Sequence, residues 1–191
     1  MSWGYAGIFN VTRITTGILI TILVGMNTGH SYAATLGEMQ ELYASQKPGT
    51  VVVCKGLTEI HIGQAEPIRI EDLQTGIVLE NEGDRMVFDV TYTRKRVGEQ
   101  DPFSTERYRL TTTLEKTRQK IAIDPQTIEL SFPHARSLEE KMLAMMKEQP
   151  VFWEDYSVYR ITTLLDYQIL PRPEKPDEAV TYCTNRAASQ K

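Results

Sequence analysis

Histidine and cysteine are scarce in this sequence of 191 residues, which holds three histidines and two cysteines. A zinc site usually takes three or four His, Cys or carboxylate ligands, and no cluster with ligand spacing is present. The G-x-S-x-G elbow, the H-E-x-x-H motif and the P-loop are also missing. Carboxylate pairs such as Glu139 and Glu140 are adjacent on a predicted helix and so face different directions. We therefore predict no metal, no cofactor and no enzymatic activity.

Long apolar runs are missing as well, since residues 14–26 give only thirteen uncharged positions. A membrane span needs about 20 apolar residues. Arg13 precedes the run, and the small residues Ser31 and Ala33 stand three and one places before a candidate cut, which is the pattern of a secretory signal. We predict that residues 1–33 are removed and that the protein is exported, to the periplasm or outside the cell. The alternative is an uncleaved N-terminal anchor.

Residues 34–191 are predicted to form a single β-rich domain with a modest negative charge. They carry 20 bases and 25 acids, because the signal contains one base and no acid. This balance argues against a general binder of polyanions. Aromatic side chains do not interleave with the bases as they do in single-strand binders, so no nucleic-acid partner is predicted.

The two cysteines, Cys54 and Cys183, lie near the two ends of the exported chain, each within a run typical of a strand. Disulfides persist in exported proteins. We predict a bridge between them and neighbouring strands, and the alternative is a pair of buried free thiols. A redox-active pair is disfavoured because no Cys-x-x-Cys motif is present.

Hydrophobic periodicity predicts a helix, about eight strands, a second amphipathic helix and two final strands. Capping-box spacings open the helices, at Thr35 with Glu38 and at Ser137 with Glu140. An apolar stripe on the second helix (Leu138, Met142, Met145 and Met146) indicates core packing or a partner surface. The predicted strands are 50–55, 58–62, 68–70, 76–81, 85–94, 106–114, 118–123, 128–132, 156–170 and 180–184.

The strands are expected to follow one another as a meander. Residues 85–94 and 106–114 form a hairpin with one apolar and one polar face, and 118–123 with 128–132 form a second one. The run 156–170 exceeds a usual strand and is expected to bend. Because a sheet with one apolar face must close on itself or be covered, we predict a mainly β fold, an antiparallel meander barrel or half-barrel. A two-sheet sandwich is the alternative.

The interior of such a barrel is the first candidate site. A small barrel either fills its interior with side chains or leaves room for one ligand. Ordinary core packing also explains aromatic residues on the inward parity. The candidate ligand-lining residues are Phe88, Tyr92, Tyr108, Tyr159 and Tyr167.

A basic patch is the second candidate, since residues 85–120 carry nine bases and five acids. Such a patch could hold a phosphate, an anionic head group or an acidic partner. An ordinary charged, solvent-facing sheet is the alternative. An amphiphile with an anionic head would place its tail in the barrel and its head near these bases. The candidate anionic-partner residues are Arg94, Lys95, Arg96, Arg107 and Arg109.

These features favour binding over catalysis. The first hypothesis is an exported, non-catalytic binding protein of the cell envelope that holds an apolar or amphiphilic small molecule in a β-barrel. The second is a partner-binding protein, an inhibitor, chaperone or secretion-apparatus accessory, which meets an acidic envelope protein through the basic hairpin or an exposed sheet edge. The third is an enzyme of unrecognised type. The processed chain could contact a membrane but not span it.

The export hypothesis makes a direct prediction. N-terminal sequencing of secreted material should begin at Ala34 or within a few residues of it, because the small residues at 31 and 33 mark the cut. Recovery of the intact Met1 terminus from a membrane fraction would contradict it.

Overall fold

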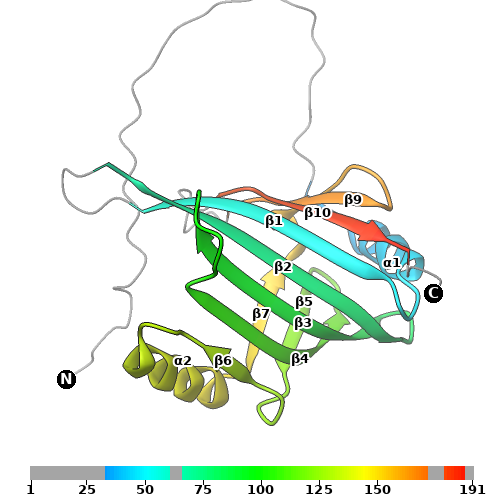
Figure 1. Ribbon diagram of the computed structural model, residues 1–191. Coiled ribbons are helices and arrows are strands. Elements are labelled where there is room, and N and C mark those ends of the chain that lie inside the picture. Colours follow the sequence, from blue (N-terminus) through cyan, green and yellow to red (C-terminus); the bar gives the residue numbers. More distant parts are fainter. Residues whose placement is uncertain (1–32, 61–65, 172–178, 188–191) are drawn as a thin grey trace, which may run out of the picture.

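Ten strands form one antiparallel sheet that curls into a nearly closed barrel (Figure 1). The computed structural model describes residues 33–60, 66–171 and 179–187. Along the sheet the strands run in the order β7-β5-β4-β3-β2-β1-β10-β9-β8, and β6 pairs with β4 off this path. This confirms the predicted barrel rather than the sandwich. The strands are β1 (Val51–Ile60), β2 (Ile68–Asn81), β3 (Arg85–Arg96), β4 (Ser104–Leu114), β5 (Arg118–Ile123), β6 (Glu129–Ser131), β7 (Val151–Asp155), β8 (Tyr159–Ile161), β9 (Asp166–Ile169) and β10 (Thr181–Arg186).

The hairpin of β3 and β4 has the predicted polarity. Phe88 pairs with Leu110 and Val90 with Tyr108. Because side chains alternate between the two faces of a strand, these four all point into the barrel. The even-numbered residues of β4 are the more buried ones throughout its length.

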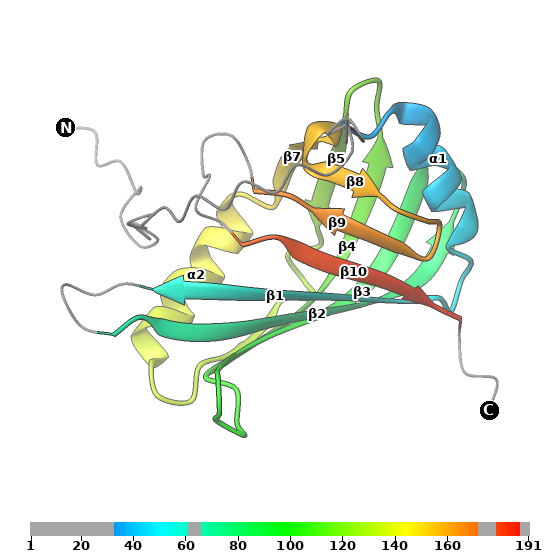
Figure 2. The same ribbon diagram turned by 90° about the horizontal axis from the view of Figure 1, so that it is seen from above.

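The N-terminal helix α1 (Leu36–Ser45) lies across one end of the barrel (Figure 2). Its capping box is confirmed: the Thr35 Oγ1 accepts from the Glu38 N–H at 3.2 Å, and the Glu38 Oε2 accepts from the Thr35 N–H at 2.7 Å. Met39, Leu42 and Tyr43 are buried in the main hydrophobic cluster. The helix therefore seals this end of the barrel with apolar side chains.

Strands β1 and β2 replace the four short strands predicted over residues 50–81. Their register is continuous, from Val51 opposite Ile77 to Ile60 opposite Ile68. Gly56 lies between two of the predicted strands, and a Cβ there would lie 3.3 Å from the Thr181 Oγ1. The glycine therefore permits the close approach of β10. The pairing of β1 with β2 continues through Gly56 without a break.

The second predicted hairpin is wrong, because β6 pairs with β4 and not with β5. The turn after β5 does form, with the Thr127 N–H donating to the Asp124 carbonyl at 3.0 Å. However, β4 is longer than β5 and leaves free edge beyond it, where Thr105, Glu106 and Arg107 pair with β6. The other edge of β5 is taken by β7, which sequence patterning missed.

Residues 156–170 form a short 3-10 helix, η1 (Tyr156–Val158), and the hairpin β8–β9 instead of one bent strand. The chain reverses over residues 162–165, where the Thr163 Oγ1 accepts from the N–H groups of Leu165 and Asp166. Four strands therefore follow the second helix, where two were predicted. Because η1 joins β7 to β8, the two end strands of the sheet are consecutive in the chain.

The second helix, α2 (Arg136–Glu148), lies beside β6, away from α1 (Figure 1). It begins one residue before Ser137, so the predicted capping box is wrong; Ala135 is the N-cap, and Glu139 accepts from the Phe132 N–H at 2.9 Å. None of its residues is buried, and Met145 is 49% exposed. The apolar stripe is therefore not core. Among the described helices, none is long and apolar enough to cross a bilayer.

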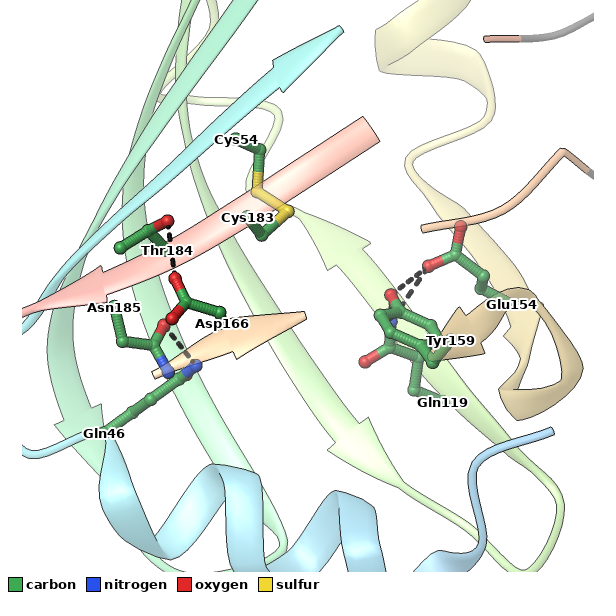
Figure 3. Close-up of a disulfide and its surroundings, with 9 residues drawn as sticks. All are labelled: Gln46, Cys54, Gln119, Glu154, Tyr159, Asp166, Cys183, Thr184 and Asn185. Atoms are coloured by element: carbon green, nitrogen blue, oxygen red, sulfur yellow. Dashed lines mark hydrogen bonds between the residues drawn. A yellow bond between two sulfur atoms is a disulfide. The ribbon is translucent and has the colours of Figure 1, made fainter. Parts of the chain in front are cut away.

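A disulfide joins the first strand to the last, as predicted (Figure 3). Cys54 and Cys183 are register partners on β1 and β10, and both are buried. Their Cα atoms are 4.0 Å apart, closer than the range of 4.4–6.8 Å typical of disulfides. Directly opposite residues on neighbouring strands approach to about 4.5 Å, which places such a pair at the short end of this range. Residues 1–32, which hold most of the predicted signal, lie outside the described residues.

Removing the disulfide should lower the free energy of unfolding substantially. The bond closes a loop with a sequence separation of 129, for which the chain-entropy model gives roughly 4–5 kcal/mol. The double variant Cys54→Ala/Cys183→Ala should therefore unfold at a lower urea concentration, followed by circular dichroism. Wild-type protein under reductant should behave alike, and an unchanged midpoint in both would contradict the prediction.

Candidate functional site

A cavity of about 240 Å³ lies inside the barrel, between α1 and the inner face of the sheet. Its walls come from α1 and from eight strands, and most of its lining is apolar. It is lined by Met39, Leu42, Tyr43, Gln46, Val52, Cys54, Gln74, Gly76, Met86, Phe88, Val90, Tyr108, Leu110, Thr112, Gln119, Ile121, Phe152, Glu154, Tyr159, Tyr167 and Ile169.

Four of the five predicted lining residues, Phe88, Tyr108, Tyr159 and Tyr167, reach the cavity. Tyr92 is not among the residues that line it. Although it points inward, it lies nearer the far end of β3, where its hydroxyl donates to the Asp72 Oδ1 at 2.7 Å. Parity along a strand sets which face a residue occupies, but not its depth along the barrel.

Tyr92 belongs to a polar cluster that sequence reasoning did not identify. The Arg94 guanidinium binds the Glu106 carboxylate at 2.5 Å and lies 5.3 Å from the centre of the Tyr92 ring. It also donates to the Ser104 Oγ at 3.0 Å. Burial raises the pKa of Glu106, and the charge of Arg94 opposes this shift. These contacts satisfy the polar groups at the end of the barrel remote from α1.

The predicted basic patch is divided by the structure. Arg94 is half-buried and bound to Glu106, as described above. Lys95 and Arg96 are exposed and form ion pairs with Glu71 at 3.0 Å and Glu99 at 3.5 Å. Arg107 and Arg109 share the outer face of β4 and are exposed; the ion pairs formed by described residues include neither. Arg107 and Arg109 thus lie together on β4, whereas the other three bases of the predicted patch are paired with carboxylates.

One wall of the cavity carries a hydrogen-bonded chain of polar side chains (Figure 3). The Tyr43 hydroxyl donates to the Gln119 Oε1 at 2.7 Å. The Gln119 Nε2 donates to the Glu154 Oε2 at 3.0 Å and to the Tyr159 hydroxyl, and the Tyr159 hydroxyl donates to the same carboxylate oxygen. Three elements, α1, β5 and β7, are thereby tied to β8.

Burial keeps the tyrosines of the cavity neutral. It raises the pKa of Tyr43, Tyr159 and Tyr167 above the ordinary value of tyrosine, and the negative charge of Glu154 raises each of these further. Burial also raises the pKa of Tyr108, to about 12. At neutral pH these hydroxyls are hydrogen-bonding groups and not charges.

Thr112 is the exception to this satisfied interior. Its side chain is 93% buried and lines the cavity, yet its Oγ1 makes no hydrogen bond with described residues. Thr112 lies near the Tyr43 hydroxyl and opposes the rise in its pKa, although the Thr112 Oγ1 forms no hydrogen bond with it. Buried polar groups normally have a partner, so this hydroxyl could pair with a molecule in the cavity.

Gly76 helps to keep the cavity open. It lies on the inner face of β2 with an ordinary backbone conformation, since the positive-φ glycines among the described residues are Gly49, Gly83 and Gly98. A Cβ at Gly76 would meet the Phe88 ring at 3.4 Å, an ordinary contact. Glycine is therefore not required by backbone geometry or by crowding, and its effect is to leave space beside Phe88.

The chemistry offered by this site is apolar contact and hydrogen bonding. In the ranges that the structure describes, no group of three or more His, Cys, Asp or Glu side chains could hold a metal ion. His134 is exposed in the loop before α2, and His61 lies outside the described residues. No family model, curated protein or solved structure matches the chain.

Sequence reasoning missed Gln119, Glu154, Gly76 and Thr112. The alternation of β5 places Gln119 on the same face as Ile121, so its inward position was readable. Glu154 could not be placed, because β7 has three consecutive apolar residues and no alternation.

The buried tyrosines predict a loss of stability at alkaline pH. Their folded pKa values lie above the ordinary value of 10.0, so the stabilisation is complete below pH 10 and is lost as pH rises toward about 12, the value for Tyr108. Tyr108→Phe should weaken this fall while leaving stability at neutral pH nearly unchanged. Urea unfolding at several pH values measures both quantities. An equally steep fall in the variant would contradict the assignment.

Proposed function

We propose that this chain is an exported, non-catalytic binding protein that holds one small apolar or amphiphilic molecule inside its barrel. The observation that carries the proposal is the cavity of about 240 Å³ behind the aromatic wall. Protein interiors are close-packed, and voids much larger than a water molecule are few. A barrel whose only role was structural would fill this space with side chains.

The cost of an empty interior supports a ligand. At about 24 cal/mol per Å³, a dry void of about 240 Å³ costs about 6 kcal/mol, comparable to the whole stability of a small domain. A bound apolar molecule would recover much of this, because a ligand that binds only the folded state stabilises it. The volume is below the 300–1,000 Å³ typical of drug-sized ligands, which favours a smaller molecule.

The disulfide supports export, because such bonds persist in oxidising compartments. It joins strands at the two ends of the described chain, so the folded barrel is best stabilised where the bond remains oxidised. This agrees with the signal pattern of residues 1–33 and with a role in the cell envelope or outside the cell.

A partner-binding role is the second candidate function, and the edge strand β7 favours it. Val151, Phe152 and Trp153 are 45, 44 and 43% exposed. Within the described sheet β7 pairs only with β5, and an exposed apolar edge is a template for another strand. The Arg118 guanidinium covers one face of Trp153, 4.1 Å from the ring centre, which reduces the surface that is free for a partner.

A cavity-filling variant tests the carrier function. Gly76→Val places two methyl groups beside Phe88, where a Cβ fits without a clash. Benzene is a suitable probe, since it enters an engineered cavity of about 150 Å³. Wild-type protein should bind benzene in an NMR chemical-shift titration, and Gly76→Val should lose this binding while remaining folded, because valine favours strands.

Thr75→Val is the matched control, because it places the same residue next in sequence on the outer face of β2. It should bind benzene as the wild type does. Failure of the wild type to bind benzene would show that the interior is closed to small apolar molecules, and the carrier function would then be wrong.

A further inference from the structure

The lining of the cavity carries one formal charge, and it is negative. Glu154 is the only Asp, Glu, Lys, Arg or His among the lining residues of the described chain. We infer that the ligand is a small amphiphile whose head donates hydrogen bonds, such as an amine or an alcohol, and that anionic amphiphiles are rejected. This inference rests on the proposed function, because it names the ligand class of the same cavity.

The direction of the hydrogen bonds supports a donor head. Tyr43 donates to Gln119, Gln119 donates to Tyr159 and Glu154, and Tyr159 donates to Glu154. All donors of this chain are therefore directed along it toward the carboxylate. Both bonds to the carboxylate end on Oε2, and its Oε1 accepts none from described residues. The unused capacity of this hydrogen-bonded chain is therefore an acceptor, the Glu154 Oε1, which a ligand can meet with a donor.

The negative charge acts across the cavity and not only on its neighbours. Glu154 raises the pKa of Tyr43 on α1, of Tyr159 on β8 and of Tyr167 on β9. Arg94 does not offset it there, because its guanidinium is bound to Glu106. An anionic head at this wall would meet like charge in a medium of low dielectric constant, where repulsion is strong. This reverses the orientation expected from the sequence, in which bases would hold an anionic head.

Exposure along the lining sets the orientation of the ligand. Phe152 is 44% exposed and Glu154 is half-buried, and both lie on the edge strand β7. Val90, Leu110 and Ile121 lie on the adjoining strands β3, β4 and β5 and are deeply buried. The donor head should thus lie near β7 and the apolar part against this second cluster.

Four probes of similar size and different heads test the ligand class: toluene, benzyl alcohol, benzylammonium and benzoate. Titrated into full-length disulfide-bonded protein at neutral pH and followed by NMR, benzylammonium should bind most tightly. Benzyl alcohol should come next, then toluene, and benzoate should not bind. We expect benzylammonium to bind about tenfold more tightly than benzyl alcohol, because hydrogen bonds between charged groups are roughly twice as strong as neutral ones.

The variant Glu154→Gln keeps the shape of the side chain and removes its charge. It should abolish the preference for benzylammonium over benzyl alcohol and leave toluene binding unchanged, which shows that the cavity is intact. Asp155→Asn is the matched control: it removes one negative charge from the next residue of β7, which does not line the cavity. This control should keep the wild-type order of the four probes.

The outcomes separate this inference from the proposed function. If toluene binds but benzoate binds as tightly as benzylammonium, the inference is wrong and the carrier function stands. The same holds if Glu154→Gln binds toluene and keeps the preference for benzylammonium. If none of the four probes binds, the carrier function itself is refuted. Should Glu154→Gln fail to fold, the wild-type order alone decides.

Discussion

Pairing of β1 with β10 is the contact on which the rest of the barrel depends. The strands from β2 to β5, with β7, form a meander that extends from one edge of β1, and the hairpin β8–β9 reaches the sheet only through β10 on the other edge. The Cys54–Cys183 bond lies within this pairing, one pair from its end. Without it the inner face of the meander would be open to water, because Tyr159 and Tyr167 could not close over it.

The cavity is a consequence of the same closure. Phe88, Leu110 and Gln119 come from the meander, whereas Tyr159 and Tyr167 come from the far side of β10. The space between the two groups is covered at one end by α1, and the Tyr92, Arg94 and Glu106 cluster lies nearer the other end of the barrel. An apolar cavity whose polar groups are mostly hydrogen-bonded within the protein is suited to hold a small molecule. Few polar atoms of such a cavity lose water when the molecule binds, so the cost of desolvation is low.

The edge strand β7 combines two properties that are rarely found in one short element. It contributes Phe152 and the charged Glu154 to the cavity, and it presents exposed apolar side chains at a free sheet edge among the described residues. In a carrier, the mobile side of the binding site is expected at such a place, since few buried contacts hold it. The exposed stripe of α2 has no equivalent link to the cavity, because no residue of α2 lines it.

The local sequence pattern was sufficient to predict a strand or helix that had one apolar face and a clear signal where it begins or ends. The capping box at Thr35, the alternation of β3 and β4 and the strand-like runs around both cysteines predicted α1, the central hairpin and the disulfide. It was also sufficient to predict a barrel, because a one-sided antiparallel sheet must close. Phe88 and Tyr108 followed from the parity of the central hairpin, whereas Tyr159 and Tyr167 line the cavity although the single strand expected to carry them is a 3-10 helix and a hairpin.

Only the tertiary structure decided which strands meet and how deep each side chain lies. β6 could pair with β5 or with the unused edge of β4, and the choice depends on the length of β4, which no local signal reports. β7 is a strand because β5 offers it an edge, although its sequence does not alternate. For the same reason the sequence did not place Glu154 or decide whether the barrel is filled or hollow. Parity tells which face a residue occupies, whereas its distance along the barrel axis and the space beside Gly76 arise only when strands from distant segments pack together.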